Sequence, residues 1–236
     1  MWIFDEKWWP SREVGGTVPL KHGSKRLTAT AIDVEGPKRV KSDARGGPNF
    51  VAAVAGKMTG EGIDPTSLLD LAPHVHDGKL TMDVSPGRWK LMIFAWQPAP
   101  GPRILVDGAS HDCVDWFLRT VHQPHYDHFK DDFGKTIVGF FYDEPETHGD
   151  WGTEVPKVLA GKGVDWKPAY VAWKFQLAGD TQAAARHAYH EALSEAWGRT
   201  LYGGMTRWCR AHGVTSFGHL LEHGSSTWTR TGARGT

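Results

Sequence analysis

The sequence has little cysteine, no excess of charge of either sign and no long apolar run. Its 236 residues include only two cysteines, Cys113 and Cys209, which cannot form a disulfide scaffold and lack the spacing of a zinc site. The 27 basic and 27 acidic side chains cancel, so the basic face that nucleic acid normally selects is not expected. No stretch approaches the ~18 consecutive apolar residues of a membrane span. We therefore expect a globular protein without nucleic-acid or membrane partners.

Targeting and nucleotide-binding signals are also missing. The first residues, Met1–Phe4, run directly into Asp5 and Glu6 instead of forming a charged and then apolar leader. None of the glycine clusters has the spacing of a phosphate-binding loop, so no cofactor is required by the sequence. The compartment and the oligomeric state stay open at this point.

Tryptophan and histidine are abundant. The chain has 12 Trp against 10 Phe, and 13 His. Tryptophan rings suit either a large core or flat platforms that stack on the apolar faces of sugar rings. Both interpretations stay open, and the number of histidines by itself assigns no function.

The first hundred residues change character near residue 20. In residues 1–19, the apolar run Trp2–Phe4 ends abruptly in acids, which is typical of a buried parallel strand leading into an active-site loop. Residues 20–102 contain short apolar runs such as 50–55 and 89–94 between Gly, Pro and Asp turns, with Asp77-Gly78 as a hairpin turn. We expect this stretch to form an inserted β-rich module that ends at a proline-rich linker.

Residues 103–223 alternate between helix and strand signals. Ser110 is a candidate helix cap, Pro124 is expected to kink or restart that helix, and an alanine-rich helix is expected over 182–199. Apolar strands are expected at 136–142 and 214–221. This order predicts a parallel sheet with right-handed crossovers. Residues 224–236 contain almost nothing apolar, and we expect a disordered or non-native tail.

Carboxylates follow each of the apolar strands. Because the carboxyl ends of parallel strands meet at one edge, we expect these acids to gather there. The predicted site contains the acids Asp5, Glu6, Asp143, Glu144 and Glu222, and near them Trp8, Trp9, Trp151 and His219. Paired acids beside aromatic rings are what glycoside cleavage needs, since one protonates the leaving oxygen and the other activates water or attacks the sugar. Taken singly, each acid could also be an ordinary helix cap.

A second motif indicates a different chemistry. Residues 219–223, His-Leu-Leu-Glu-His, match the H-x-x-E-H pattern of inverted zinc proteases. That pattern requires a helix, whereas here it follows a β-favouring run, and no acid or histidine follows His223 as a third ligand. A zinc hydrolase is therefore the minor alternative, and we assign no metal ligands.

Several of these stretches resemble one family, the rhamnosidase-like glycoside hydrolases of family 106. The resemblance lies in Phe4-Asp5-Glu6 followed by Trp9-Pro10-Ser11 and Gly15-Gly16, in 137–145, and in Trp208-Cys209, His212-Gly213 and Gly218-His219. It extends to about Glu222. Arg12 stands where the family usually has glycine.

The resemblance implies a (β/α)8 barrel that removes terminal sugars such as α-L-rhamnose from polysaccharides, with glutamate acid/base chemistry and often calcium. It implies secretion or a periplasmic location for a full-length protein. It assigns Glu222 as the general acid, places Asp143 and Glu144 in the catalytic site or near a cation, and makes Asp5, Glu6 and Trp9 its wall. Trp8, Trp9, Trp151 and His219 are the expected substrate-binding residues.

The predicted fold is α/β, a partial (β/α)8 barrel of about three strands with an inserted small β-sheet module. Because a closed barrel takes eight strands, we expect the chain to be a fragment of a larger glycosidase and to be poorly active by itself. The alternative is a carbohydrate-binding remnant that uses the same acids and tryptophans without a complete catalytic pair.

Overall fold

A computed structural model of the chain describes residues 1–4, 12–44, 47–60, 62–145 and 149–219. The chain divides into two compact units. Unit 1 comprises residues 1–26, 98–155 and 193–236, and unit 2 comprises residues 27–97 and 156–192. Within the described residues, no helix is long and apolar enough to cross a membrane.

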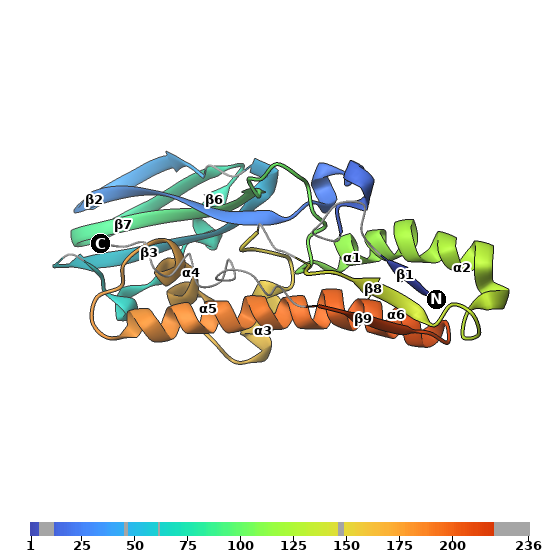
Figure 1. Cartoon of the computed structure of the whole chain (residues 1–236). Coiled ribbons are helices and arrows are strands. Elements are labelled where there is room, and N and C mark those ends of the chain that lie inside the picture. The colour runs from blue at the N-terminus through green and yellow to red at the C-terminus, as the bar shows by residue number, and fades with distance from the viewer. Residues whose placement is uncertain (5–11, 45–46, 61, 146–148, 220–236) are drawn as a thin grey trace. The chain divides into compact units, whose positions relative to one another are not determined.

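Unit 2 is built on a six-stranded, mainly antiparallel sheet (Figure 1). Its central order is β2-β7-β3-β4, with β5 paired to β3 and β6 paired to β7. The strands are β2 (Lys25–Asp43), β3 (Phe50–Thr59), β4 (Gly62–Ile63), β5 (Leu69–Asp70), β6 (Val75–His76) and β7 (Lys79–Pro98). The two apolar runs expected as strands are therefore confirmed as parts of β3 and β7.

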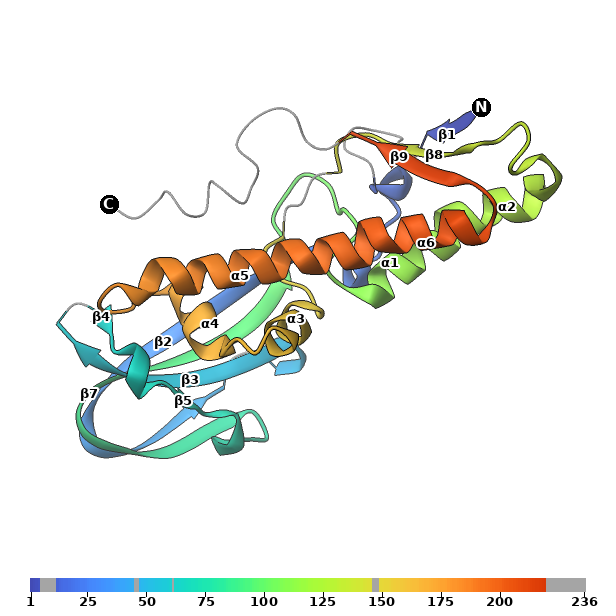
Figure 2. The same cartoon turned by 90° about the horizontal axis from the view of Figure 1, so that it is seen from below.

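Both faces of this sheet are buried along β3 and β7. On one face, Ala53, Leu91 and Ile93 belong to an apolar cluster. On the other face, the ring of Phe94 lies 5.8 Å from that of Tyr170 and 6.2 Å from that of Phe175. Tyr170 lies in α4 (Trp166–Lys174), which covers this face together with the beginning of α5 (Thr181–Trp197), as Figure 2 shows. Burial on two faces explains why these strands are continuously apolar instead of alternating.

The predicted hairpin turn is confirmed. Strands β6 and β7 pair antiparallel with Val75 opposite Leu80 and His76 opposite Lys79. The two turn residues, Asp77 and Gly78, have φ values of 48° and 71°. Positive φ at both central residues is the requirement of the tight turn that best matches strand twist, and Asp-Gly meets it at small cost.

Unit 1 contains a three-stranded parallel sheet in the order β1-β8-β9. Its strands are β1 (Trp2–Phe4), β8 (Gly139–Tyr142) and β9 (Thr215–Gly218). Trp2 lies opposite Gly139, which lies opposite Thr215, and Phe4, Phe141 and Phe217 align in the same way. The prediction that the strands before Asp143 and Glu222 run parallel is confirmed.

Helices of unit 1 pack on one face of this sheet (Figure 2). The first group is α1 (His111–Phe117), a π-helical turn at Leu118–His122, and α2 (Gln123–Phe129), with Pro124 in the first turn of α2. The second group is the end of α5, a π-helical turn at Gly198–Tyr202, and α6 (Gly203–Ala211). The break that the sequence predicted at Pro124 is a change of helical pitch rather than an interruption, and a second change of pitch precedes Gly203. Helix α3 (Val155–Gly161) begins at the end of this stretch of unit 1 and lies almost entirely in unit 2.

The two faces of the parallel sheet differ sharply. Phe140 is fully buried and packs with Cys209 and Val214, with Ile3 against them. Alternate residues point the other way, and there Trp2, Phe4 and Phe217 are 44%, 52% and 57% exposed. We call Trp2, Phe4, Phe141 and Phe217 the aromatic face; its rings are neighbours, with Phe4 and Phe141 stacked at 5.2 Å.

The barrel prediction is wrong. The larger sheet of the described residues is antiparallel, and the parallel sheet has three strands that do not close on themselves. The error has a physical reason: an apolar run ending in acids marks any buried parallel strand, and it carries no information on how many strands join the sheet. The β-rich stretch supplies the strands of the larger of the two sheets.

Candidate functional site

The carboxyl ends of β8 and β9 bring together Asp143 and His219, and Glu144 follows Asp143 in the chain. The backbone N–H of His219 donates to the carbonyl of Tyr142 over 3.2 Å, which extends the β8–β9 pairing by one step. The imidazole Nδ1 of His219 lies 3.1 Å from Oδ1 of Asp143. The ring of Phe141 meets the imidazole edge-on at a centroid distance of 5.2 Å. An acid and an imidazole from different strands therefore form one pair.

Three residues of unit 1 that are not glycine have a strained backbone. Glu144 has a φ of 37°, Arg12 of 78° and Val14 of 51°, all in the left-handed region that favours glycine. Arg12 and Glu144 are also buried, with 1% and 8% exposure. Such conformations persist only where the surroundings enforce them, and they are concentrated at functional sites. Arg12 thus occupies a glycine-like conformation at the position where the resembled family usually has glycine.

Arg12 is held by its surroundings despite this backbone. Its guanidinium donates to the carbonyl oxygen of Val106 and lies 4.6 Å from the ring centroid of Trp197. A cation over an indole face is attracted by the ring, and more strongly when water is excluded. A buried positive charge is therefore fixed in unit 1.

Two tyrosines add hydroxyl groups to this unit. The rings of Tyr142 and Tyr202 lie 5.9 Å apart. Burial raises the pKa of Tyr142 to about 12, with a further contribution from Tyr202. Burial also raises the pKa of Tyr202, while the charge of Arg12 acts in the opposite direction. Both phenols keep their protons at neutral pH and can act as hydrogen-bond donors.

A buried ion pair fastens the segments of unit 1 together. Nζ of Lys25 lies 2.8 Å from Oδ2 of Asp107, and both side chains are almost fully buried. Asp107 also accepts from the hydroxyl of Ser110 at 2.7 Å and from the backbone of Ala109 at 2.9 Å. Desolvation is the largest single effect and lowers the pKa of Lys25, but the charge and hydrogen bond of Asp107, together with the contributions of Cys113, outweigh it and the pKa is raised. The hydroxyl of Ser110, which was expected to cap the N-terminus of α1, therefore donates to Asp107 and makes no capping hydrogen bond.

Trp151 belongs to the same region. Trp151 is 8% exposed, and its backbone forms an isolated antiparallel β-bridge with that of Lys25. The structure therefore places Trp151 inside unit 1 rather than on an open platform. Its assignment to substrate binding stays a prediction.

The other predicted site residues divide into two sets. Asp143 and His219 come together at the strand ends, and Glu144, next to Asp143 in the chain, is buried. Asp5, Glu6, Trp8, Trp9 and Glu222 lie outside the described residues. Sequence reasoning did not single out Arg12, Tyr142 or Tyr202; only Arg12 carried a usable signal, as the residue standing at a family glycine.

Metal chemistry gains no support from the described part of the chain. Within it, no group of three His, Cys, Asp or Glu side chains could hold a metal ion. His219 lies in extended pairing with β8, whereas the zinc-protease pattern requires its first histidine on a helix. The rest of that pattern, residues 220–223, lies outside the described residues. Calcium binding stays an expectation from the resemblance.

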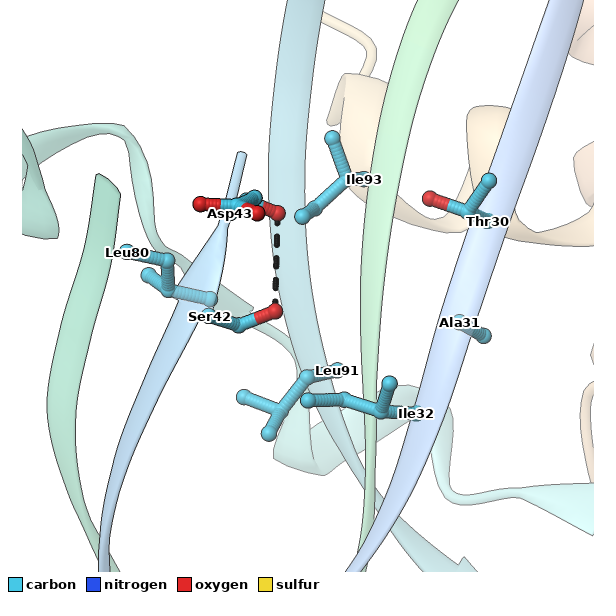
Figure 3. A pocket seen from close by; sticks show the side chains of 8 residues that line it. All are labelled: Thr30, Ala31, Ile32, Ser42, Asp43, Leu80, Leu91 and Ile93. Atoms are coloured by element: carbon cyan, nitrogen blue, oxygen red, sulfur yellow. Dashed lines mark hydrogen bonds between the residues drawn. The ribbon is translucent and has the colours of Figure 1, made fainter. Parts of the chain in front are cut away.

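A concave site of different character lies in unit 2 (Figure 3). Its volume is about 150 Å³, and its lining is mostly aliphatic, with Thr30, Ser42 and Asp43 as the polar members. The hydroxyl of Ser42 lies 3.4 Å from the carbonyl oxygen of Asp43. A second cavity of about 230 Å³ in unit 1 is lined by Pro98, Pro100 and neighbouring residues. Neither is lined by Asp143 or His219, so neither encloses the acid–histidine pair.

Comparison with known proteins gives a match among solved structures. No protein-family model matches the sequence, and no curated protein matches it. Among solved structures, the chain is similar to a rhamnosidase from Novosphingobium sp. PP1Y, with a TM-score of 0.56 and 21% identity. The match covers 70% of this chain and 17% of that one. The chain therefore has a distant rhamnosidase-like fold and corresponds to a small part of the length of that enzyme.

Proposed function

We propose that the chain is a glycoside hydrolase-like protein that acts on terminal sugars of the α-L-rhamnose type. The observation that carries this proposal is the pairing of Asp143 with His219 at one edge of a parallel sheet, with Glu144 next in the chain, in a fold similar to that of a rhamnosidase. In α/β folds, ligands bind at the carboxyl ends of the parallel strands, which is where Asp143 and Glu144 lie.

The residues supply the groups that hydrolysis needs. Asp143 is partly exposed and paired, while Glu144 is buried beside it, so the two acids occupy different environments. Different environments are what separates an acid from a base within one site. Glu222 is proposed as the general acid, on the family resemblance alone.

The second candidate function is carbohydrate binding without hydrolysis. The aromatic face favours it, since exposed aromatic rings are typical of sugar-binding surfaces. The stacked arrangement of Phe4 and Phe141 weakens it, because two rings stacked on each other present edges rather than faces to solvent. Sugar stacking uses ring faces.

A panel of aryl glycosides combined with calorimetric titration of L-rhamnose separates the two functions. We expect binding together with slow release of the aryl group from α-L-rhamnosides, and a loss of turnover of about 10²-fold or more in Asp143→Asn and in Glu144→Gln. Asp131→Asn is the matched control, since Asp131 is an exposed acid of unit 1. Binding without turnover would support the second function, and neither binding nor turnover would contradict both.

A further inference from the structure

The pairing of His219 with Asp143 reverses the roles that the sequence predicted for them. The sequence made Asp143 a catalytic acid and His219 a substrate-binding residue. We infer that His219 is the group that moves the proton of the attacking water, and that Asp143 is the positioning residue that orients it. This inference rests on the proposed function and assigns chemistry within its site.

The imidazole of His219 is held from three sides. Its backbone N–H is tied to the carbonyl of Tyr142 at 3.2 Å, its Nδ1 to the carboxylate of Asp143 at 3.1 Å, and its ring contacts Phe141 edge-on at 87°. A carboxylate accepts hydrogen bonds only, so Nδ1 must carry the hydrogen. In the neutral imidazole, Nε2 then has a lone pair. A carboxylate that fixes the tautomer and direction of a histidine is the arrangement that prepares an imidazole for proton transfer.

The two side chains also differ in exposure, and the difference supports the same assignment of roles. The side chain of His219 is 54% exposed and that of Asp143 is 30% exposed. The more accessible member of the pair is therefore the imidazole, and one oxygen of Asp143 is already engaged by it. The imidazole contacts the ring of Phe141, so the pair lies on the side of the sheet that carries the aromatic face, which the helices leave uncovered.

The proposed step balances without an external reactant other than water. Nε2 of His219 accepts a proton from water as the water oxygen bonds to the anomeric carbon. The glycosidic C–O bond breaks, and its electron pair goes to the leaving oxygen. With a natural sugar, that oxygen takes its proton from the carboxylic acid that the proposed function already requires; with an acidic phenol it needs none. His219 then returns its proton to solvent.

The first test reads the tautomer of His219 directly and needs no activity. In the whole chain labelled with ¹⁵N, two-bond ¹H–¹⁵N correlation should show neutral His219 with hydrogen on Nδ1, opposite to the preference of free histidine. In Asp143→Ala this signal should change to the Nε2–H form, and Asp143→Glu should restore it in part. His125 and His212, whose Nδ1 atoms pair with backbone carbonyls, are internal controls that should not change. An Nε2–H form in the wild type, or no change in Asp143→Ala, would overturn the positioning role.

The second test follows hydrolysis of 2,4-dinitrophenyl α-L-rhamnoside, whose leaving group needs no acid. His219→Ala should lower kcat by about 10²–10⁴-fold, and added imidazole should restore part of the rate. Asp143→Ala should lower kcat by a smaller factor with little change in KM. Hydrolysis that survives His219→Ala contradicts this inference alone, whereas no hydrolysis by the wild type contradicts the proposed function.

Discussion

The two sheets of this protein differ in how many of their faces are buried. In unit 2, β3 and β7 bury both faces, one in an apolar cluster and one under α4, where Phe94 meets Tyr170. In unit 1, the parallel sheet buries Phe140 on one face and leaves Trp2, Phe4 and Phe217 about half exposed on the other. Parallel sheets are normally covered on both faces, so the difference identifies the aromatic face as the unusual surface of the chain.

The residues of the candidate site also belong to only one of the two units. The acid–histidine pair and the strained residues Arg12 and Glu144 all belong to unit 1. The cavity shown in Figure 3, in unit 2, has mostly aliphatic walls. The larger sheet thus has the more complete core, and the smaller sheet has the candidate site.

The ion pairs of the two units give the largest expected contrast. Asp107→Ala in unit 1 leaves Lys25 buried without its partner carboxylate, and we expect a loss of about 3–5 kcal/mol in the free energy of unfolding. Asp43→Ala in unit 2 breaks the pair with Lys79, whose side chain is 69% exposed, and should cost about 1 kcal/mol or less. Urea titration of both variants measures the difference. Equal losses would mean that burial does not distinguish these two pairs.

Two substitutions compare the two faces of the parallel sheet. Phe140→Ala removes a fully buried ring from the core under α6 and should cost about 3–5 kcal/mol. Phe217→Ala removes a ring that is 57% exposed and should cost about 1 kcal/mol or less. Thermal unfolding followed by near-ultraviolet circular dichroism separates the two. A large loss in Phe217→Ala would show that the aromatic face is covered in solution.

The strand pairing beneath the site depends on a glycine. A Cβ on Gly218 would lie 2.0 Å from the carbonyl oxygen of Tyr142, so Gly218→Ala must push β9 away from β8. We expect a loss of about 1–3 kcal/mol and a change in the His219 imidazole signal. The control is Gly198→Ala, because a Cβ there meets nothing within 4 Å. Retention of the wild-type His219 signal in Gly218→Ala would contradict this geometry.

Acid should weaken unit 1 through a buried histidine. His122 is 1% exposed and stacks on Phe140 at 4.0 Å; burial lowers its pKa to about 3, and His125 and His212 act in the same direction. In the unfolded chain this group titrates at its ordinary value of 6.5. Below that pH the unfolded state binds the extra proton, so stability is lost as the pH falls toward 3.

Removing this histidine should remove its part of the acid sensitivity. We expect His122→Phe to reduce the slope of unfolding free energy between pH 6 and 4 by up to about 1.4 kcal/mol per pH unit. His128→Gln, an exposed histidine of α2, should leave the slope unchanged. Urea titrations across this pH range provide the measurement. The same slope in His122→Phe and the wild type would mean that His122 is not buried as a neutral group.

Much of the local structure could be predicted from the sequence because it depends on neighbouring residues. The turn at Asp77-Gly78, the strands around Phe94 and Phe140, and the parallel direction of β8 and β9 all follow from periodicity and turn chemistry. The number of strands in a sheet depends on contacts between distant segments, and there the barrel prediction failed.

The candidate site shows the same limit. Sequence alone determined that Asp143 and Glu144 follow an apolar strand, because this is a property of a short segment. It placed His219 inside the strand expected at 214–221, whereas β9 ends at Gly218, one residue earlier. Only the tertiary structure decided that the carboxylate of Asp143 is paired with His219, that Arg12 is buried against Trp197, and that the aromatic face stays exposed. Side-chain partners depend on the register between strands that are more than 70 residues apart, as for Asp143 and His219, and no local pattern records that register.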